Sequence, residues 1–129
     1  MNNRVLLVED NEDNFELVRF LLERAGFVVL AGHDGQEGLD LAVQELPDLI
    51  LMDLSLPGID GWTAARELKA NPVTCHIPLM ALTAHTLPGD RKRAMESGFD
   101  GYISKPIDVV HFGESIINAL EASQKKTLE

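Results

Sequence analysis

Cysteine is almost absent from this sequence of 129 residues, and long hydrophobic runs are missing. The one thiol, Cys75, cannot form a disulfide within the chain, and His76 is too close in sequence to share a zinc site with it. No apolar segment approaches the roughly 18 residues that a membrane-spanning helix needs. The start of the chain reaches acidic residues after a run of only four apolar ones, 5–8. We therefore expect a cytoplasmic protein with no membrane partner and a reduced thiol.

Basic residues are also scarce, with 11 Lys and Arg against 21 Asp and Glu, which gives a formal net charge of −10. Non-specific binding to phosphate backbones depends on Lys and Arg displacing counterions, so we expect no direct nucleic-acid partner. The acidic balance indicates little else, because many cytosolic proteins are acidic and stay soluble for that reason.

The sequence does contain enough apolar residues, 45% of the chain, for one compact core. No repeat, low-complexity tract or linker divides it. We assign residues 1–122 to one domain and residues 123–129, SQKKTLE, to a frayed polar tail.

Five short apolar runs predict β-strands, at 4–8, 27–31, 48–52, 78–82 and 101–105. Four other segments place apolar residues at helical spacing, at 18–25, 39–46, 62–68 and 109–120. The remaining segment, 88–98, is mostly polar and has the weakest helical pattern. Helix ends, or turns just beyond them, are expected at Gly26, Pro47, Pro72 and Gly98.

This alternation of strand and helix predicts an α/β fold. The central apolar runs are nearly continuous and do not alternate with polar residues, which indicates a parallel sheet covered by helices on both faces. Right-handed crossovers then give a doubly wound sheet of five strands with five helices.

Polar residues follow the ends of four predicted strands. Glu9 and Asp10 come after the first strand, Asp53 ends the third, Thr83 ends the fourth, and Lys105 ends the fifth. Because the carboxyl ends of parallel strands lie along one edge of a sheet, where such folds bind ligands, we expect these residues to form one site.

Three neighbouring carboxylates repel one another unless positive charge lies among them. Lys105 supplies one cation, and Mg²⁺ suits the site because it binds through one or two carboxylates together with water and phosphate oxygens. Asp53 can then attack an incoming phosphoryl group and become an aspartyl phosphate. The hydroxyl of Thr83 can reach a phosphoryl oxygen, and Ala84 is small enough to leave the site open. The loop after the fourth strand would move as a switch.

The motifs VLLVEDN, LILMDLSLPGIDG, ALTA and GYISKP, at these spacings, resemble those of the receiver domain of bacterial two-component response regulators. The resemblance covers almost the whole chain and implies the flavodoxin-like strand order 2-1-3-4-5, as in chemotaxis receivers. The segment YISKPIDVVHF also resembles single-domain members of the family that regulate cell division.

The resemblance implies a signalling protein that catalyses only its own phosphorylation and dephosphorylation. Asp53 would accept phosphate from a phosphohistidine on a sensor histidine kinase or a histidine phosphotransfer protein. Phosphorylation would then change the surface of the fourth helix, fifth strand and fifth helix, which binds a downstream protein target. A phosphorylation-dependent homodimer is left open.

Further roles are implied by the resemblance. Asp10 and Asp53 would bind Mg²⁺ directly with the backbone carbonyl of Ser55, and Glu9 would act through water. Thr83 and Tyr102 would form a switch pair, in which the ring turns inward as the hydroxyl moves to the phosphate.

The resemblance also covers the turn after the last strand and two positions near the site. It implies a cis Lys105-Pro106 bond, and Pro106 suits the first turn of the last helix. Ser55 and His85 occupy positions that in this family tune the lifetime of the phosphate. We predict that His85 borders the approach of water to the phosphoryl group, so an unchanged dephosphorylation rate in His85→Ala would contradict this role.

Structural interpretations compete with these roles. Asp53 could cap a turn before Pro-Gly, and the segment 9–11 could serve as the acidic start and cap of the first helix. Lys105 could be an ordinary surface lysine, although its place within a buried strand argues against this, and Tyr102 could be plain packing.

Two further features have open interpretations. Trp62 could contact a partner or be partly buried. The run 91–93, Arg-Lys-Arg, could be a solvated face or part of the surface that reads out the switch.

Three other functions fit less well. A hydrolase of the haloacid dehalogenase type needs a second aspartate two residues after the first, where Ser55 stands. A flavodoxin-like cofactor carrier needs a hydroxyl- and glycine-rich phosphate loop, but the corresponding loop is EDNEDN. A receiver-like docking module that works without phosphorylation would keep the fold but would not need the complete set of site residues.

Overall fold

The structure of the chain, a computed structural model, describes residues 3–83 and 88–128, the side chains of 88–91 and 123–128 excepted. Five parallel strands form one sheet in the order β2-β1-β3-β4-β5, which confirms the predicted fold and strand order. The strands are β1 (Arg4–Val8), β2 (Val28–Gly32), β3 (Leu49–Asp53), β4 (Leu79–Thr83) and β5 (Gly101–Ser104). The helices are α1 (Glu12–Arg24), α2 (Gly35–Glu45), α3 (Gly61–Ala70), α4 (Pro88–Glu96) and α5 (Phe112–Leu128).

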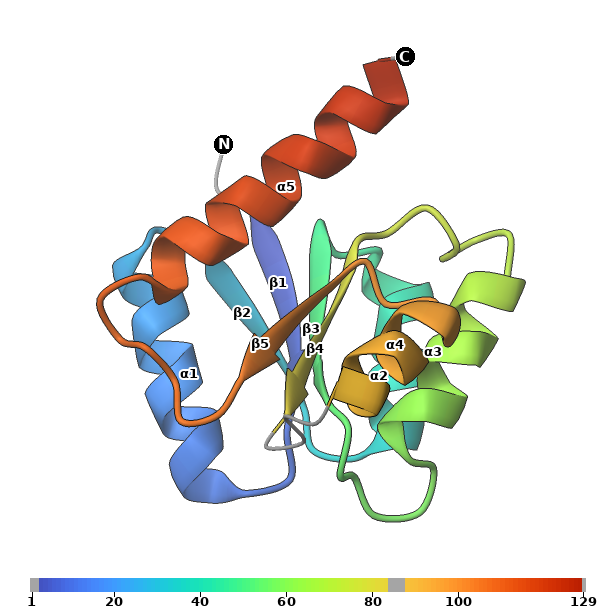
Figure 1. Cartoon of the computed structure of the whole chain (residues 1–129), viewed down its shortest axis with the longest axis horizontal. Helices are drawn as coiled ribbons and strands as arrows, with labels where there is room; N and C mark the ends of the chain where they lie inside the picture. Colours follow the sequence, from blue (N-terminus) through green and yellow to red (C-terminus); the bar gives the residue numbers. More distant parts are fainter. Residues whose placement is uncertain (1–2, 84–87, 129) are drawn as a thin grey trace.

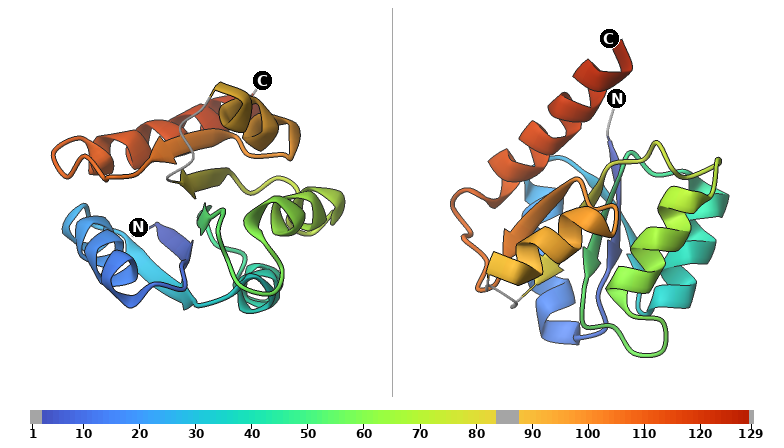
Figure 2. Two further views of the ribbon diagram at one scale, coloured as in Figure 1. Left: turned by 60° about the horizontal axis from the view of Figure 1, so that its bottom comes forward. Right: turned by 45° about the vertical axis from the view of Figure 1, so that its right-hand side comes forward.

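Helices cover both faces of the sheet, as Figures 1 and 2 show. Successive residues of a strand point to opposite faces, so β1 contributes to two separate cores. Val5 and Leu7 pack in the cluster formed with α1 and α5, whereas Leu6 and Val8 pack in the cluster formed with α2, α3 and α4. The central strand β3 is buried along its whole length, which explains its nearly continuous apolar run.

Most helix ends lie where the sequence predicts them. Gly26 and Gly98 follow α1 and α4 with φ of 97° and 110°, values that glycine adopts without strain. Asn11, Asp34 and Asp60 cap the amino ends of α1, α2 and α3, and each side chain accepts a hydrogen bond from a backbone N–H three residues on.

The start of α5 differs from the prediction. Asp108 Oδ1 accepts hydrogen bonds from the backbone N–H groups of Val110 and His111, which forms a turn before the helix begins at Phe112. Pro106 is therefore not in the first helical turn. Val109, expected on the apolar face of the helix, lies in the preceding turn and is 54% exposed.

The end of α5 also differs. Its backbone continues through Leu128, whereas a frayed segment was expected from residue 123. No glycine or proline follows Gly113, so nothing in residues 114–128 stops the helix. The domain boundary at residue 122 stays a prediction.

Lys105 does not lie within a buried strand as expected. Edge strand β5 ends at Ser104 and is only partly buried, since it has a neighbouring strand on one side alone. Lys105 follows it, with 19% of its side chain exposed. The Lys105-Pro106 peptide bond is cis, as the family resemblance implies.

Candidate functional site

The register of the sheet brings four strand ends together. Val8 lies opposite Met52, so Glu9 follows β1 beside Asp53 at the end of β3. Thr83 lies opposite Ser104, and the backbone N–H of Lys105 donates to the Thr83 carbonyl at 2.7 Å. The predicted residues from β1, β3, β4 and β5 therefore gather at the carboxyl edge of the sheet, at the bottom of Figure 1.

Three carboxylates form the centre of this edge. One oxygen each from Glu9, Asp10 and Asp53 lie within 4.8 Å of one another. Glu9 is fully buried and Asp53 is 4% exposed, whereas Asp10 is exposed to solvent. Among the described residues this is the one such group of potential metal ligands.

Lys105 supplies the positive charge that this group needs. Its Nζ lies 2.8 Å from Asp53 Oδ2 and 3.6 Å from Glu9 Oε2. The first distance is that of a charge-assisted hydrogen bond, and the second is an ion pair too long for one. Lys105 is thus an inward-facing partner of the acidic group and not an ordinary surface lysine.

The two buried carboxyl groups differ in their pKa. The pKa of Glu9 is raised from 4.5 to about 8, mainly by burial and also by its hydrogen bond and charge interaction with Asp53, whereas Lys105 and Asn14 act to lower it. For Asp53, burial alone would raise the pKa, but hydrogen bonds from Glu9, Lys105 and the Ser55 N–H together hold it below its usual value. A proton on Glu9 therefore stabilises the anionic form of Asp53.

Backbone and side-chain donors orient these carboxylates. The backbone N–H of Ser55 donates to Asp53 Oδ1 at 2.8 Å, and Asn14 Nδ2 donates to Glu9 Oε1 at 3.4 Å. Asn14 was missed by sequence reasoning, because a single asparagine inside an amphipathic helix gives no signal of the direction in which it points. The carbonyl of Ser55 as a metal ligand stays a prediction.

Thr83 and Tyr102 lie on the same face of neighbouring strands. Tyr102 pairs with Ala81, two residues before Thr83, so both side chains point to the face covered by α2, α3 and α4. Thr83 is buried, and Tyr102 is partly buried with a hydroxyl that has no hydrogen-bond partner among the described residues. This placement is compatible with the predicted pair, whose switching role stays a prediction.

The loop after Asp53 is held by a close backbone contact. A Cβ at Gly61 would lie 2.6 Å from the Asp53 carbonyl oxygen and 2.7 Å from Leu54 Cα. Only glycine lets α3 begin this close to the end of β3. The glycine is visible in the sequence, but this contact is not.

The open structural alternatives are partly resolved. Asn11 does cap α1, so the segment 9–11 serves both the helix and the site. Trp62 is 8% exposed and packs edge-on against Phe99, with the Arg93 guanidinium 4.4 Å from its ring centroid. Lys92 and Arg93 are exposed, whereas the side chain of Arg91 and the residues Ala84 and His85 lie outside the described part.

The donor set fits a hard divalent cation. Carboxylate oxygens are the ligands that Mg²⁺ prefers, and Asp10 leaves the group open to solvent on one side. Glu9 Oε2 is buried and accepts no hydrogen bond from a described residue, so an ion or its bound water would satisfy this oxygen once Glu9 has lost its proton.

Comparison with known proteins agrees with the geometry. Residues 5–117 match the response regulator receiver domain family. The polar-differentiation response regulators DivK of Brucella ovis and Brucella melitensis are each 44% identical over 116 residues, which is 90% of this chain and 94% of theirs.

Solved structures show the same fold. The receiver domain of the sensor histidine kinase PA1611 from Pseudomonas aeruginosa, with a magnesium ion coordinated in its active site cleft, has a TM-score of 0.87 at 32% identity, covering 94% of this chain and 99% of that one. A receiver domain protein from Clostridium thermocellum has a TM-score of 0.85 at 28% identity, covering 98% and 99%. In the described part of the chain, no helix has the length and apolar character to cross a membrane. The family match over residues 5–117 and the 44% identity to the DivK proteins show that the chain belongs to the response regulator receiver domain family.

Proposed function

We propose that this protein is a single-domain response regulator in which Asp53 accepts a phosphoryl group in a Mg²⁺-dependent reaction. The observation that carries the proposal is the 2.8 Å contact between Lys105 Nζ and Asp53 Oδ2 beside a group of three carboxylates. The similarity to DivK over most of both chains supports the single-domain form. A phosphohistidine donor implies a sensor histidine kinase or histidine phosphotransfer partner, and hence a cytoplasmic location.

Glu9, Asp10, Asp53 and the carbonyl of Ser55 would hold the metal, with Glu9 acting through water. Bound Mg²⁺ would supply positive charge for the phosphoryl oxygens. The name of the Pseudomonas receiver structure, which includes a magnesium ion in its cleft, supports this assignment.

The phosphoryl group would pass directly from the imidazole of the donor to the carboxylate of Asp53. A carboxylate oxygen of Asp53 forms a bond to phosphorus while the phosphorus–nitrogen bond of the donor breaks, and the electron pair stays on the imidazole nitrogen. Lys105 would neutralise charge on the phosphoryl group in place of its present contact with Asp53. Attack of water on the aspartyl phosphate would later release inorganic phosphate, which is the sense in which the protein catalyses its own dephosphorylation.

Phosphorylation would be read out on another part of the surface. The hydroxyl of Thr83 would move to the phosphoryl group, and Tyr102 would respond because it lies on the same face of the adjacent strand. This change would alter the surface formed by α4, β5 and α5, which would bind a downstream protein or a second copy of the chain.

Intact-mass spectrometry after incubation with acetyl phosphate and Mg²⁺ tests the proposal. We expect the wild type to gain the mass of one phosphoryl group, and we expect no gain in Asp53→Asn or in EDTA. Asp60→Asn is the matched control, because asparagine can keep the cap that Asp60 provides to α3. A phosphate adduct that persists in Asp53→Asn would refute the acceptor, and no adduct in the wild type would favour a docking module that works without phosphorylation.

A further inference from the structure

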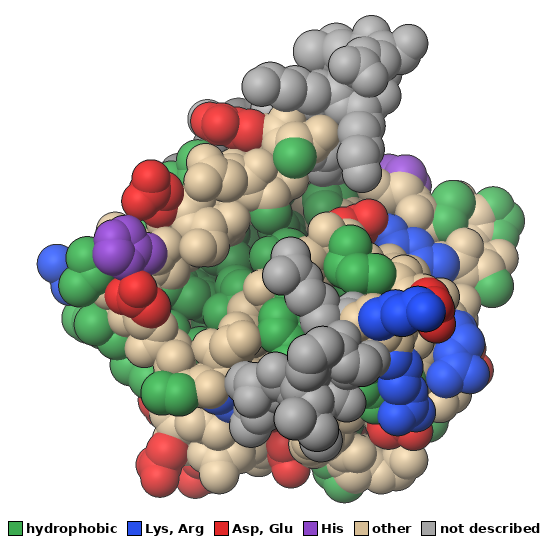
Figure 3. All heavy atoms as spheres, in the orientation of Figure 1, with side chains coloured by type: hydrophobic (Ala, Val, Ile, Leu, Met, Phe, Trp, Pro, Cys, Tyr) green, Lys and Arg blue, Asp and Glu red, His purple; other side chains and the backbone are tan. Residues whose placement is uncertain are grey.

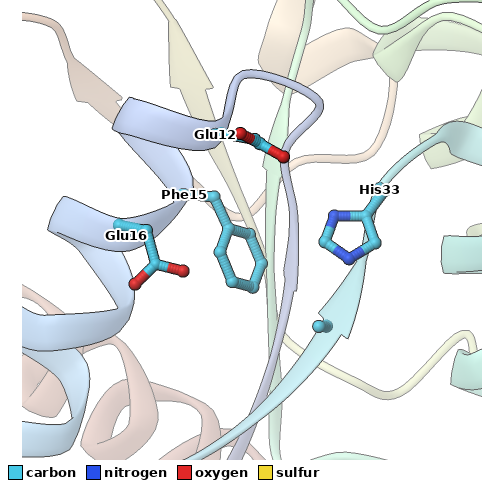
Figure 4. Close-up of a pocket in the computed structure, with 5 residues that line it drawn as sticks. Glu12, Phe15, Glu16 and His33 are labelled. Atoms are coloured by element: carbon cyan, nitrogen blue, oxygen red, sulfur yellow. The ribbon is translucent and has the colours of Figure 1, made fainter.

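A cleft of about 380 Å³ opens beside the acidic group, between α1 and the end of β2. Its lining residues are Glu12, Phe15, Glu16, Ala31 and His33 (Figure 4). The cleft is close to the candidate site, because the backbone N–H of Glu9 donates to the carbonyl of Gly32, the residue before His33, at 3.0 Å. None of the five lining residues has a role in the proposed phosphoryl transfer.

The cleft combines two carboxylates with two rings. Glu12 and Glu16 are one helical turn apart on α1, and both are exposed. The Phe15 and His33 rings contact each other, with centroids 5.2 Å apart and planes inclined at 47°. Phe15 is almost fully buried whereas His33 is exposed, so the imidazole is the ring that an entering group meets.

One of the carboxylates already has a basic partner. Arg19 Nη2 contacts Glu16 Oε2 in a surface ion pair whose side chains are 45% and 60% exposed. Exposed pairs of this kind are weak and exchange easily. Arg19 also lies 3.8 Å from Glu23, so it keeps an acidic neighbour when Glu16 binds another cation.

The two carboxylates and the exposed imidazole favour a planar cation. A guanidinium can donate to a carboxylate in a forked geometry and stack on a ring at the same time, which an ammonium cannot do. The surroundings favour a basic partner, because residues 9–16 contain five acidic and no basic residues.

We propose that this cleft receives an arginine side chain of the protein that donates the phosphoryl group to Asp53. The inference rests on the proposed function only in naming the phosphodonor as the partner. The arginine would lie between Glu12 and Glu16 with its plane against His33, and would orient the donor at the edge of the sheet that holds Asp53.

An NMR titration of the ¹⁵N-labelled full chain with N-acetyl-arginine amide tests the inference. We expect saturable shifts centred on the backbone amides of residues 12–16 and 31–33, and none with N-acetyl-citrulline amide, the neutral analogue of similar shape. The double variant Glu12→Gln/Glu16→Gln should lose about tenfold in affinity because two charge-assisted contacts are removed. Glu67→Gln, which removes an exposed carboxylate of α3 outside the cleft, is the control and should bind as the wild type does.

Three outcomes would overturn the inference: no shifts at saturating ligand, equal shifts with both ligands, or shifts centred elsewhere. If the double variant misfolds, which the same spectra report, His33→Ala tests the stacking contact without changing α1, and unchanged affinity in it would also contradict the inference. Failure of acetyl phosphate to label wild-type Asp53 would remove the proposed function and, with it, the identity of the partner, but not the arginine site. Absence of arginine-specific shifts would remove the arginine site and leave the proposed function intact.

Discussion

Glu9 and Asp53 are buried carboxyl groups that share one environment but titrate differently. The pKa of Glu9 is raised to about 8, mainly by burial, whereas that of Asp53 is lowered because Lys105, Glu9 and Ser55 all donate to it. In the metal-free protein near pH 7, the proton is therefore on Glu9 and the negative charge is on Asp53.

We predict that the metal-free protein loses stability as pH rises from 6 to 9. An acid whose pKa is raised by folding stabilises the fold below its unfolded value, near 4.5, and this contribution is lost as pH rises through about 8. The contribution of Asp53, whose pKa is lowered, is instead lost on acidification below its usual value of 3.8, so the two pH windows are separate. Thermal unfolding in EDTA at a series of pH values measures the effect.

The matched variant for this measurement is Glu9→Gln, which should have a flatter stability profile between pH 6 and 9. Mg²⁺ should raise the melting temperature of the wild type more at pH 9 than at pH 6, because binding requires the deprotonated acids. An identical pH profile for wild type and Glu9→Gln would show that another group titrates.

We predict that Lys105→Ala slows labelling of Asp53 by acetyl phosphate by about 10²-fold, because one preorganised donor for the developing charge is lost. Lys92→Ala is the control, since Lys92 lies on the exposed surface of α4 in a loose pair with Glu96 at 3.9 Å. Equal labelling rates for Lys105→Ala and the wild type would mean that the ammonium plays no part in the transfer.

At the scale of elements, the junction of β3 and α3 depends on a close backbone approach. We predict that Gly61→Ala destabilises the fold by about 1–3 kcal/mol, because the new Cβ would overlap the backbone of Asp53 and Leu54. Thr63→Ala, at an exposed position of the same helix, should stay within about 0.5 kcal/mol of the wild type. Urea unfolding of the wild type and the two variants measures these differences in the free energy of unfolding. Equal stability of Gly61→Ala and Thr63→Ala would contradict the close approach.

Helices α3 and α4 are joined by the stacking of Arg93 on Trp62. We predict that Arg93→Ala lowers stability by about 0.5–1 kcal/mol, the range of an exposed cation–π contact, and changes the emission of Trp62, the only tryptophan of the chain. Tryptophan fluorescence during unfolding gives both quantities. Emission and stability equal to those of Lys92→Ala would show that the contact is absent in solution.

The sequence predicts elements better than their junctions. The buried strand β3 and the glycine after α1 have local patterns that fix them, and both are confirmed. The predicted start of α5 was wrong, because Asp108 caps a turn in place of the first predicted helical turn. Local side-chain hydrogen bonds of this kind compete with the helix that apolar periodicity predicts. The close contact of Gly61 with β3 could not be predicted, because it depends on how two elements pack.

In the molecule as a whole, the parallel sheet brings the residues of the candidate site together at one edge. Residues from four strand ends meet there although up to 96 positions separate them, from Glu9 to Lys105, and the strand-end pattern alone was enough to select Glu9, Asp53 and Lys105. Asn14 was missed because its position in a helix carries no such rule.

Charge is also distributed unevenly over the whole molecule. Acidic side chains lie along the lower edge in Figure 3, where the strands end, and basic side chains gather over α3 and α4. In a chain of net charge −10, this arrangement would direct a basic partner to the edge that holds Asp53 and away from the basic surface of α3 and α4.

The central claim is that the carboxylate of Asp53 becomes an acyl phosphate. Treating the acetyl phosphate-labelled protein with borohydride reduces an acyl phosphate of aspartate to homoserine, and tandem mass spectrometry of the digested protein then identifies the residue. We predict homoserine at position 53 and at no other aspartate, and only when Mg²⁺ is present during labelling. Homoserine at position 10 or 60, or none at position 53, would contradict the claim.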